Sequence, residues 1–234
     1  TPLYSSAASD VYKRQQAIGE MLGYIRSYDT TEEFHTLGVH TWDANAKNPE
    51  WLERKKEFIT IDSDLGCIYG MSAEIVGINY LDIISRLKFD PNDRGIIWNF
   101  WNPQYFHLSC LRPCMMMHQF NVLNDTLYLN SYQRSCDLLL GGNFNMLQAW
   151  FLLQITAKLT GLKAGTVMHT LSNIHIYENQ IELAKEQVLR EPYQAPTFVF
   201  KKNLTIEDVM DNITKDNMDD YFACLLYTSP SPRD

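Results

Sequence analysis

Two strand-like stretches on either side of a two-residue turn restrict the fold of this chain more than any other feature. Residues 114–123, CMMMHQFNVL, run into Asn124-Asp125, and residues 126–135, TLYLNSYQRS, follow directly. Stretches of this composition, separated by two residues that favour turns, are typical of a β-hairpin. The sequence therefore predicts an antiparallel pair of strands in the middle of the chain.

The length of the turn fixes which residues of the hairpin face each other. If Leu123 pairs with Thr126, counting back along both strands places Cys114 opposite Ser135. Arg134 then lies beside that position. A three-residue loop would move the partner of Cys114 by one residue and leave the same neighbourhood around it.

Helical and strand periodicities surround the hairpin without strict alternation. Such an order favours an α+β fold over a doubly wound parallel sheet. Helices are expected at about residues 16–28, 79–89, 146–157 and 178–191, with Pro192 closing the last, and further strands at about 95–101, 166–177 and 197–202. The helix near 79–89 should bury Leu81, Ile84 and Leu87, and the long helix should bury one face made of Met146, Ala149, Trp150, Leu153 and Ala157, with Gly161 beyond its end.

The balance of charge argues against two classes of partner. The 234 residues carry a formal net charge of -8, which gives no electrostatic footprint for nucleic acid or an anionic membrane surface. The most apolar stretch, residues 146–159, is interrupted by polar side chains and is too short to span a bilayer. Five unevenly spaced cysteines, and no secretory leader, lead us to expect a reducing, cytoplasmic location.

Both ends of the chain differ from the rest. Residues 1–15 and 224–234 have no apolar periodicity and resemble translated sequencing-adapter read-through, so we expect them to be non-native. No linker rich in Gly, Pro or Ser divides the residues between them. A single domain at 16–223 is therefore predicted, with both natural termini missing.

Cys114 has three interpretations that residue chemistry alone leaves open. If Arg134 lies next to the sulfur, its fixed positive charge favours the thiolate and so a nucleophile. A cysteine in an apolar strand is more often buried and inert. Zinc is a third alternative, since His107, Cys110 and His118 lie near Cys114 in the sequence, although four ligands crowded into twelve residues do not match zinc-finger spacing.

Residues 132–145 carry the motif that separates these interpretations. YQRSCD at 132–137 leads into LGGNFN at 140–145, and the combination closely resembles the signature of thymidylate synthases. Six further segments resemble motifs of that family, in the family's order: GEMLGYI, TWDANA, GCIYG, NDRGIIWNFWNP, LRPCM and IHIY. The resemblance implies an α+β fold in which a mixed β-sheet packs against helices and one sheet face forms a homodimer interface.

The resemblance also implies a reaction, the reductive methylation of dUMP to dTMP. The co-substrate would be 5,10-methylenetetrahydrofolate, which supplies both carbon and hydride, and no metal would be needed. C5 of uracil is a poor nucleophile until a group adds at C6, and a thiolate adds well and leaves well afterwards. By resemblance Cys114 forms this adduct, Arg134 activates it, Glu20 organises proton transfer and Tyr69 places a hydroxyl nearby.

Other family positions are expected to bind the two substrates. The expected dUMP contacts are Arg94, Gln133, Arg134, Ser135, Asn145, His175 and Tyr177, and the expected folate contacts are Trp42 and Asp137. The amide of Asn145 offers one donor and one acceptor, which match O4 and N3–H of uracil. Arg94 would be given across the dimer interface to the partner's phosphate site. Taken singly such residues are more often structural, with Asn145 as a helix cap and Glu20 as a solvated helix residue.

The chain departs from the family pattern at four positions and at both ends. Met115 stands where histidine commonly follows the nucleophile, Gly95 where an arginine is usual, Asn45 where a tryptophan is, and Asn173 where an aspartate is frequent. The N-terminal phosphate loop and the C-terminal closing segment are not found, so weak dUMP binding and little turnover are expected. A dUMP hydroxymethylase on the same fold and a non-catalytic nucleotide-binding relative stay open as alternatives.

Overall fold

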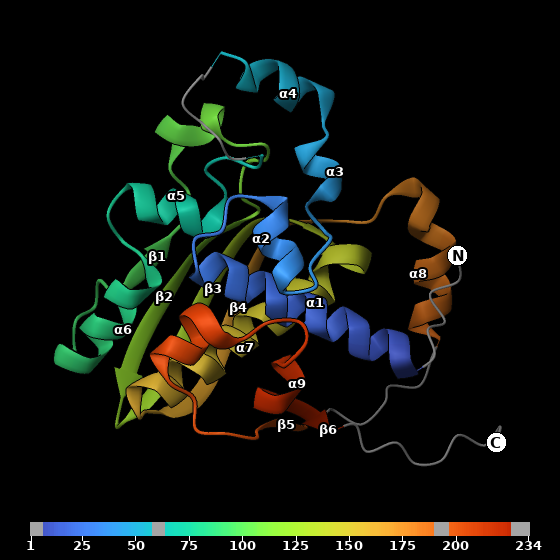
Figure 1. The fold of residues 1–234 in the computed structure, drawn as a ribbon. Helices are drawn as coiled ribbons and strands as arrows, with labels where there is room; N and C mark the ends of the chain where they lie inside the picture. The colour runs from blue at the N-terminus through green and yellow to red at the C-terminus, as the bar shows by residue number, and fades with distance from the viewer. Residues whose placement is uncertain (1–6, 58–63, 190–196, 226–234) are drawn as a thin grey trace.

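The centre of the fold is a four-stranded mixed sheet in the order β1-β2-β3-β4, accompanied by a two-stranded ribbon, β5-β6 (Figure 1). The computed structural model describes residues 7–57, 64–189 and 197–225. Only β3 and β4 pair in parallel, and the expected α+β class is confirmed. The strands are β1 (Ile97–Asn99), β2 (Met115–Leu123), β3 (Thr126–Asp137), β4 (Lys163–His175), β5 (Thr197–Phe200) and β6 (Phe222–Leu225). The α-helices are α1 (Ala7–Ile25), α2 (Thr31–Thr36), α3 (Asp43–Ala46), α4 (Pro49–Lys55), α5 (Tyr69–Ile75), α6 (Tyr80–Phe89), α7 (Asn143–Thr160), α8 (Ile181–Val188) and α9 (Met218–Tyr221). Short 3-10 or π turns are η1 (Pro103–Leu108), η2 (Leu138–Gly142), η3 (Glu178–Gln180) and η4 (Asp208–Asn212).

The predicted hairpin is present, and its turn consists of the two predicted residues. Leu123 pairs with Thr126 across Asn124 and Asp125. Both turn residues have positive φ, 49° and 58°. Two-residue turns of this kind match the twist of the strands, and Asn and Asp tolerate the conformation at low cost.

A bulge in β2 interrupts this regular register. The pairing shifts by one residue between Met115 and Met117, so that two residues of β2 face one residue of β3. The carbonyl oxygen of Met116 accepts the N–H of Phe100, just beyond β1, at 2.8 Å. The bulge is therefore tied to the strand on the other side of β2.

The bulge changes the residue that faces Cys114. The N–H of Arg134 donates to the carbonyl oxygen of Cys114 at 2.9 Å, so these two residues lie opposite each other. The prediction of Ser135 as the partner is wrong by one residue, because the regular count continued through the bulge. Arg134 is consequently closer to Cys114 along the ladder than the sequence predicts.

Helices α1 and α7 pack together on one face of the sheet (Figure 1). On another side α7 meets the ribbon, where the ring of Phe151 lies 5.3 Å from that of Phe222. Ala149, Leu153 and Ala157 are buried as predicted, but α7 is covered on several sides, so the buried residues are not confined to one face. Met146 is 41% exposed, whereas residues outside the predicted face, such as Phe151 and Ile155, are fully buried. Gly161 ends the helix with φ of 74°, as expected.

Helix α6 begins with a capping box, in which the side chain of Asn79 and that of Asp82 each accept the other's backbone N–H. Ile84 and Leu87 are buried, as predicted, but Leu81 is 40% exposed. The predicted start of the helix, near residue 79, is therefore confirmed, and its predicted buried face is confirmed only in part. No helix among residues 7–57, 64–189 and 197–225 has the length and apolar character needed to cross a bilayer.

The remaining elements differ from the predicted ones mainly at their boundaries. The first helix starts earlier, at Ala7, the strand predicted at 95–101 is reduced to β1, and the helix predicted at 178–191 is a 3-10 turn followed by α8. Pro192, predicted to close that helix, lies outside the described residues. Helices α2 to α5 were not predicted, since short helices give little periodicity to detect.

The face of the sheet away from α1 and α7 carries exposed apolar side chains. Tyr128 and Tyr132 of β3 are 37% and 38% exposed, and Met168 of β4 is 66% exposed. Their neighbours Leu127 and Leu129 are fully buried, because successive strand residues point to opposite faces. We call Tyr128, Tyr132 and Met168 the outer patch.

Candidate active site

A cavity of about 210 Å³ lies between α1, the loop before α3, α5, the start of β2 and the start of α7. Five of the twelve predicted site residues line it: Glu20, Trp42, Tyr69, Cys114 and Asn145. The other lining residues are Met21, Tyr24, Thr41, Asn45, Phe100, Leu111, Met115, His118 and Gln148. The cavity thus joins a thiol, a carboxyl, two phenols, an imidazole and three amides from segments far apart in the sequence.

Cys114 is partly exposed at this cavity and is held there by Tyr69. The backbone N–H of Cys114 donates to the Tyr69 hydroxyl at 3.1 Å. The Tyr69 ring is fixed in turn by stacking on Tyr24, with centroids 4.3 Å apart. Burial raises the pKa of the Tyr69 phenol well above its usual range, and negative charge on Cys114 adds to the rise. Tyr69 therefore keeps its proton and remains a hydrogen-bond donor.

The guanidinium of Arg134 lies against the segment that carries Cys114. Its Nε donates to the carbonyl of Pro113 at 2.9 Å and its Nη2 to the carbonyl of Arg112 at 3.2 Å. The indole of Trp101 lies beneath it, 5.3 Å from the guanidinium carbon. These contacts fix a positive charge against the segment that carries Cys114, and they leave three of the five guanidinium N–H groups for other acceptors.

Glu20 is buried, so it is not the solvated helix residue that its position in the sequence left possible. Its carboxylate accepts the hydroxyl of Thr41 and the amide N–H of Gln148, the latter at 2.6 Å. Burial raises the pKa of the Glu20 carboxyl, and the hydrogen bonds from Thr41 and Gln148 oppose that rise. It is not a solvated helix residue but a buried acid that faces the cavity.

Several other predicted residues gather at the carboxyl ends of the parallel strands β3 and β4, and none of them lines the cavity. Ser135 lies beside Asn173, and Asp137 beside His175, in the parallel ladder. The rings of His175 and Tyr177 are 5.3 Å apart and nearly perpendicular, which agrees with their predicted position on one side of the strand.

Asp137 and Gln133 already have structural partners. One oxygen of Asp137 accepts the N–H groups of Leu139 and Leu140 at the start of η2, and the other accepts Nε2 of Gln180 at 3.0 Å. Gln133 is buried and donates to the carbonyl of Ser135 at 2.8 Å. Asp137 is therefore a helix cap in this chain, whatever else it contacts.

Arg94 lies apart from the other predicted residues. It is exposed in the loop before β1, and its carbonyl accepts Nε2 of Gln119 on β2 at 3.2 Å. The single chain does not bring its guanidinium to the cavity, and it does not line it. The donation of Arg94 to a partner subunit stays a prediction.

Comparison with known proteins tests the resemblance directly. The profile of the thymidylate synthase family matches residues 10–223. The chain belongs to the thymidylate synthase family. It is 48% identical over 215 residues to the thymidylate synthase of Aliivibrio fischeri, 46% over 214 to that of Vibrio parahaemolyticus and 45% over 216 to that of Vibrio cholerae. These matches cover 86–88% of this chain and 74–75% of each relative.

Three polar residues of this thymidylate synthase family member were not predicted although they line the cavity: Thr41, His118 and Gln148. Gln148 stood out in the sequence only as an interruption of an apolar run. The sequence indicates His118 only as a candidate zinc ligand. Its Nδ1 lies 2.8 Å from the hydroxyl of Ser131, and burial lowers its pKa to about 3, so the ring is neutral near neutral pH.

The zinc alternative at the nucleophile is not supported by the geometry. Among the described residues, His107, Cys110, Cys114 and His118 do not form a group of potential ligands. Burial also raises the pKa of Cys110 to about 12, which disfavours the thiolate that binds zinc. Elsewhere in the described residues, between α2 and α3, His35, His40 and Asp43 do form such a group.

Proposed function

We propose that this chain converts dUMP to dTMP at the cavity, with 5,10-methylenetetrahydrofolate as carbon and hydride donor. The observation that carries the proposal is that Cys114, Tyr69, Glu20 and Asn145 line one cavity, with the Arg134 guanidinium held against the segment that carries the cysteine. Family membership supports the reaction. The proposal assigns the catalytic domain to residues 16–223.

Cys114 is the nucleophile of the proposed mechanism. Its thiolate bonds to C6 of the uracil ring, and the displaced electron pair of the C5–C6 bond moves toward C5 and O4. The guanidinium of Arg134 positions the segment that carries Cys114 by donating to the carbonyls of Pro113 and Arg112. The co-substrate supplies a one-carbon unit that bonds to C5, C5 then loses its proton, and hydride from the co-substrate completes the methyl group. Once C5 carries its methyl group, the C6–S bond breaks and the thiolate is regenerated.

Glu20 handles protons, Asn145 selects the base, and Tyr69 positions the nucleophile. Because burial raises its pKa, Glu20 can hold a proton at a pH where an exposed glutamate could not, and so can exchange it with O4 through water. The amide of Asn145 pairs with O4 and N3–H of uracil, whereas cytosine presents the opposite pattern. Tyr69 positions Cys114 through its hydroxyl.

The nucleotide phosphate is assigned to Arg134, Gln133 and Ser135, and the ribose to His175 and Tyr177. The support is that these residues cluster on β3 and at or just beyond the end of β4, and that Arg134 keeps donors for a phosphate in fork geometry. For the folate, Trp42 supplies an aromatic wall of the cavity. Asp137 can accept one more bond, since each carboxylate oxygen has two lone pairs.

The working unit is proposed to be a homodimer formed through the outer patch. Tyr128, Tyr132 and Met168 are apolar or aromatic side chains on a sheet face that no helix of the described chain covers. Aromatic residues and methionine are enriched at the cores of protein interfaces. Arg94, exposed and remote from its own cavity, is then the residue given to the phosphate site of the partner subunit.

The experiment that tests the reaction is a single-turnover conversion with the protein in excess over labelled dUMP. With methylenetetrahydrofolate present, chromatography should show dTMP and stoichiometric dihydrofolate, and Cys114→Ser should give neither. Accumulation of hydroxymethyl-dUMP with tetrahydrofolate would identify a hydroxymethylase instead. Binding of dUMP without any conversion would favour the non-catalytic alternative and contradict the proposal.

A further inference from the structure

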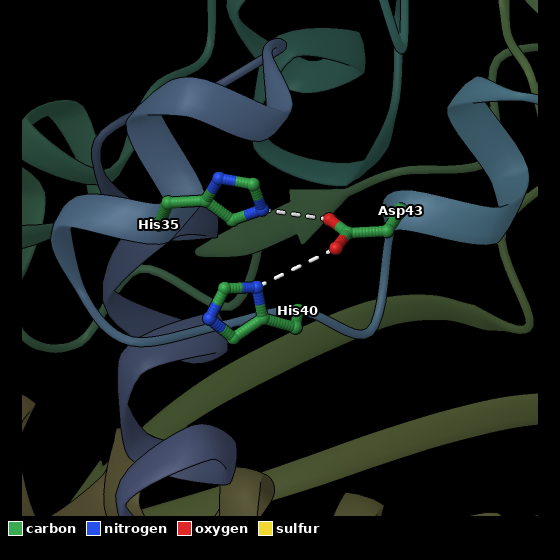
Figure 2. Close-up of side chains that lie close together, drawn as sticks. All are labelled: His35, His40 and Asp43. Carbon is green, nitrogen blue, oxygen red and sulfur yellow. Dashed lines mark hydrogen bonds and ion pairs between the residues drawn. The ribbon is translucent and has the colours of Figure 1, made fainter.

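Two imidazoles and a carboxylate converge outside the cavity. His35 comes from the last turn of α2, His40 from the loop after that helix, and Asp43 is the first residue of α3. Figure 2 shows both rings turned toward the Asp43 carboxylate. Nε2 of His35 lies 2.7 Å from Oδ1, Nδ1 of His40 lies 3.4 Å from Oδ2, and the ring centroids are 4.4 Å apart.

The spacing of these atoms suits a small metal ion. One ligand atom from each residue lies within 4.8 Å of the other two. A tetrahedral ion with bonds of about 2.0–2.2 Å needs ligand atoms about 3.3–3.5 Å apart, so closure requires shifts of an ångström or so. The three side chains are 37–50% exposed, and rotation about their own bonds can provide such shifts.

The chemistry of the donors selects the class of metal. Two imidazole nitrogens and one carboxylate oxygen form a set that zinc uses when a fourth position is left for water. Calcium and magnesium prefer oxygen ligands alone.

We propose that His35, His40 and Asp43 form a three-ligand site for a divalent transition metal ion, with zinc as the preferred occupant. The site differs in all its residues from the zinc alternative that the sequence suggested at the nucleophile. It also does not depend on the proposed function, since none of the three residues lines the cavity.

The position of this site ties it to the cavity through the backbone. Thr41 and Trp42 lie between His40 and Asp43, and both line the cavity. Thr41 donates its hydroxyl to Glu20. A metal bound by His40 and Asp43 would therefore hold both ends of the two-residue segment that supports Glu20 and provides the aromatic wall.

Calorimetric titration of the chelator-treated, reduced full chain with zinc chloride tests the site. We expect one tight site in the unmodified chain. Mutating a residue that only hydrogen-bonds to a metal ligand typically weakens metal affinity about 10- to 100-fold. Loss of a ligand itself, in His40→Ala or His35→Ala, should therefore weaken zinc binding at least about tenfold. His107→Ala, which removes an exposed histidine outside the cluster, should change it less than twofold.

A second probe separates this site from zinc binding at cysteines. Cobalt(II) held by nitrogen and oxygen in four-coordinate geometry gives visible d–d bands without the thiolate charge-transfer band. These bands should appear in the unmodified chain and in His107→Ala and be lost in His40→Ala. Circular dichroism of each variant checks that it is folded, and His40, in a loop and exposed, is the ligand whose removal should disturb the fold least.

The coupling to the cavity has its own readout. Zinc should shift the indole N–H resonance of Trp42, assigned by its absence in Trp42→Phe, and should leave it unmoved in His40→Ala. The metal proposal is overturned if the unmodified chain shows no one-to-one zinc site, or if His35→Ala and His40→Ala both bind zinc as the unmodified chain does. The cluster would then be an ion pair only. Because neither nucleotide nor folate is used, that result would leave the proposed function untouched.

Discussion

Replacement of Tyr69 by phenylalanine isolates the hydroxyl that holds the nucleophile. The change keeps the ring and its stack on Tyr24, with centroids 4.3 Å apart, and removes the acceptor that lies 3.1 Å from the N–H of Cys114. Loss of the acceptor of a buried donor costs about 1–3 kcal/mol, and the Cys114 N–H is part-buried, so that range is an upper bound here. If that loss falls on the transition state for addition to C6, it corresponds to a rate reduced roughly 5- to 150-fold.

Tyr80→Phe provides a matched control inside the same core. Its hydroxyl lies 2.9 Å from Oγ1 of Thr156, is buried, and belongs to a residue that does not line the cavity. Both variants should therefore lower the free energy of unfolding by a similar amount, about 1–2 kcal/mol. Only Tyr69→Phe should also slow the reaction.

Two measurements on the same preparations decide the matter. Urea denaturation gives the free energies of unfolding, and single-turnover conversion of dUMP gives the rates. The reasoning is refuted if Tyr69→Phe converts dUMP as fast as the unmodified chain. It is equally refuted if Tyr80→Phe slows conversion as much as Tyr69→Phe does, because the effect would then reflect general loosening of the core.

Three further changes have outcomes that the structure predicts. Glu20→Gln should abolish conversion, yet it should raise the free energy of unfolding at pH 8 and leave it unchanged at pH 4. Because the pKa of Glu20 is higher in the folded than in the unfolded state, its contribution to stability is complete below the unfolded-state pKa and is lost as pH rises through the folded-state pKa. The neutral amide of the variant does not titrate and so avoids this loss. Urea titrations that depend on pH alike in both proteins would contradict this. Gly70→Ala would place the new Cβ atom 1.8 Å from the carbonyl oxygen of Tyr24 and should therefore lower the urea midpoint strongly. Gly77→Ala is the control: its Cβ atom would meet no atom within 4 Å, so only the positive φ of that residue adds strain, and the urea midpoint should fall far less. Arg134→Lys keeps the positive charge but loses the pair of hydrogen bonds that the guanidinium donates to the carbonyls of Pro113 and Arg112. Conversion should slow about tenfold or more, while the urea midpoint changes little. An unchanged rate would argue against a role for the guanidinium geometry.

The hairpin could be predicted because its determinants are local. Asn124 and Asp125 adopt the positive φ values that a two-residue turn requires, and this preference belongs to the residues themselves. The bulge could not be predicted, because Met116 leaves the ladder to accept a hydrogen bond from Phe100 on a different segment. The exact partner of Cys114 therefore depended on a contact that counting along two strands does not include.

The buried faces of the helices were predicted less well than their positions. A single apolar stripe is the pattern of a helix with one covered side, whereas α7 is packed against the sheet, α1 and the β5-β6 ribbon at once. Its sequence is apolar nearly all round, and choosing one face placed Met146 inside when it is 41% exposed. Tertiary packing, not local periodicity, decides which residues of such a helix are buried.

The candidate site was accessible from motifs but not from residue chemistry alone. Glu20 had an ambiguous place on its helix, and only the fold shows it buried against Gln148, which is 128 residues away in the sequence. Thr41 was missed for the same reason. The cluster of His35, His40 and Asp43 was missed because a loop conformation, not a regular spacing, brings its members together.

The central claim is that Cys114 bonds to C6 of uracil at this cavity, and the adduct with 5-fluoro-dUMP tests it most directly. The fluorine cannot leave C5 as a proton does, so the covalent complex should persist in the presence of methylenetetrahydrofolate. Peptide mass spectrometry should then find one nucleotide and one folate on the peptide that contains Cys114, and none in Cys114→Ser. A modification mapped to Cys110 or Cys136, or none at any cysteine, would contradict the account.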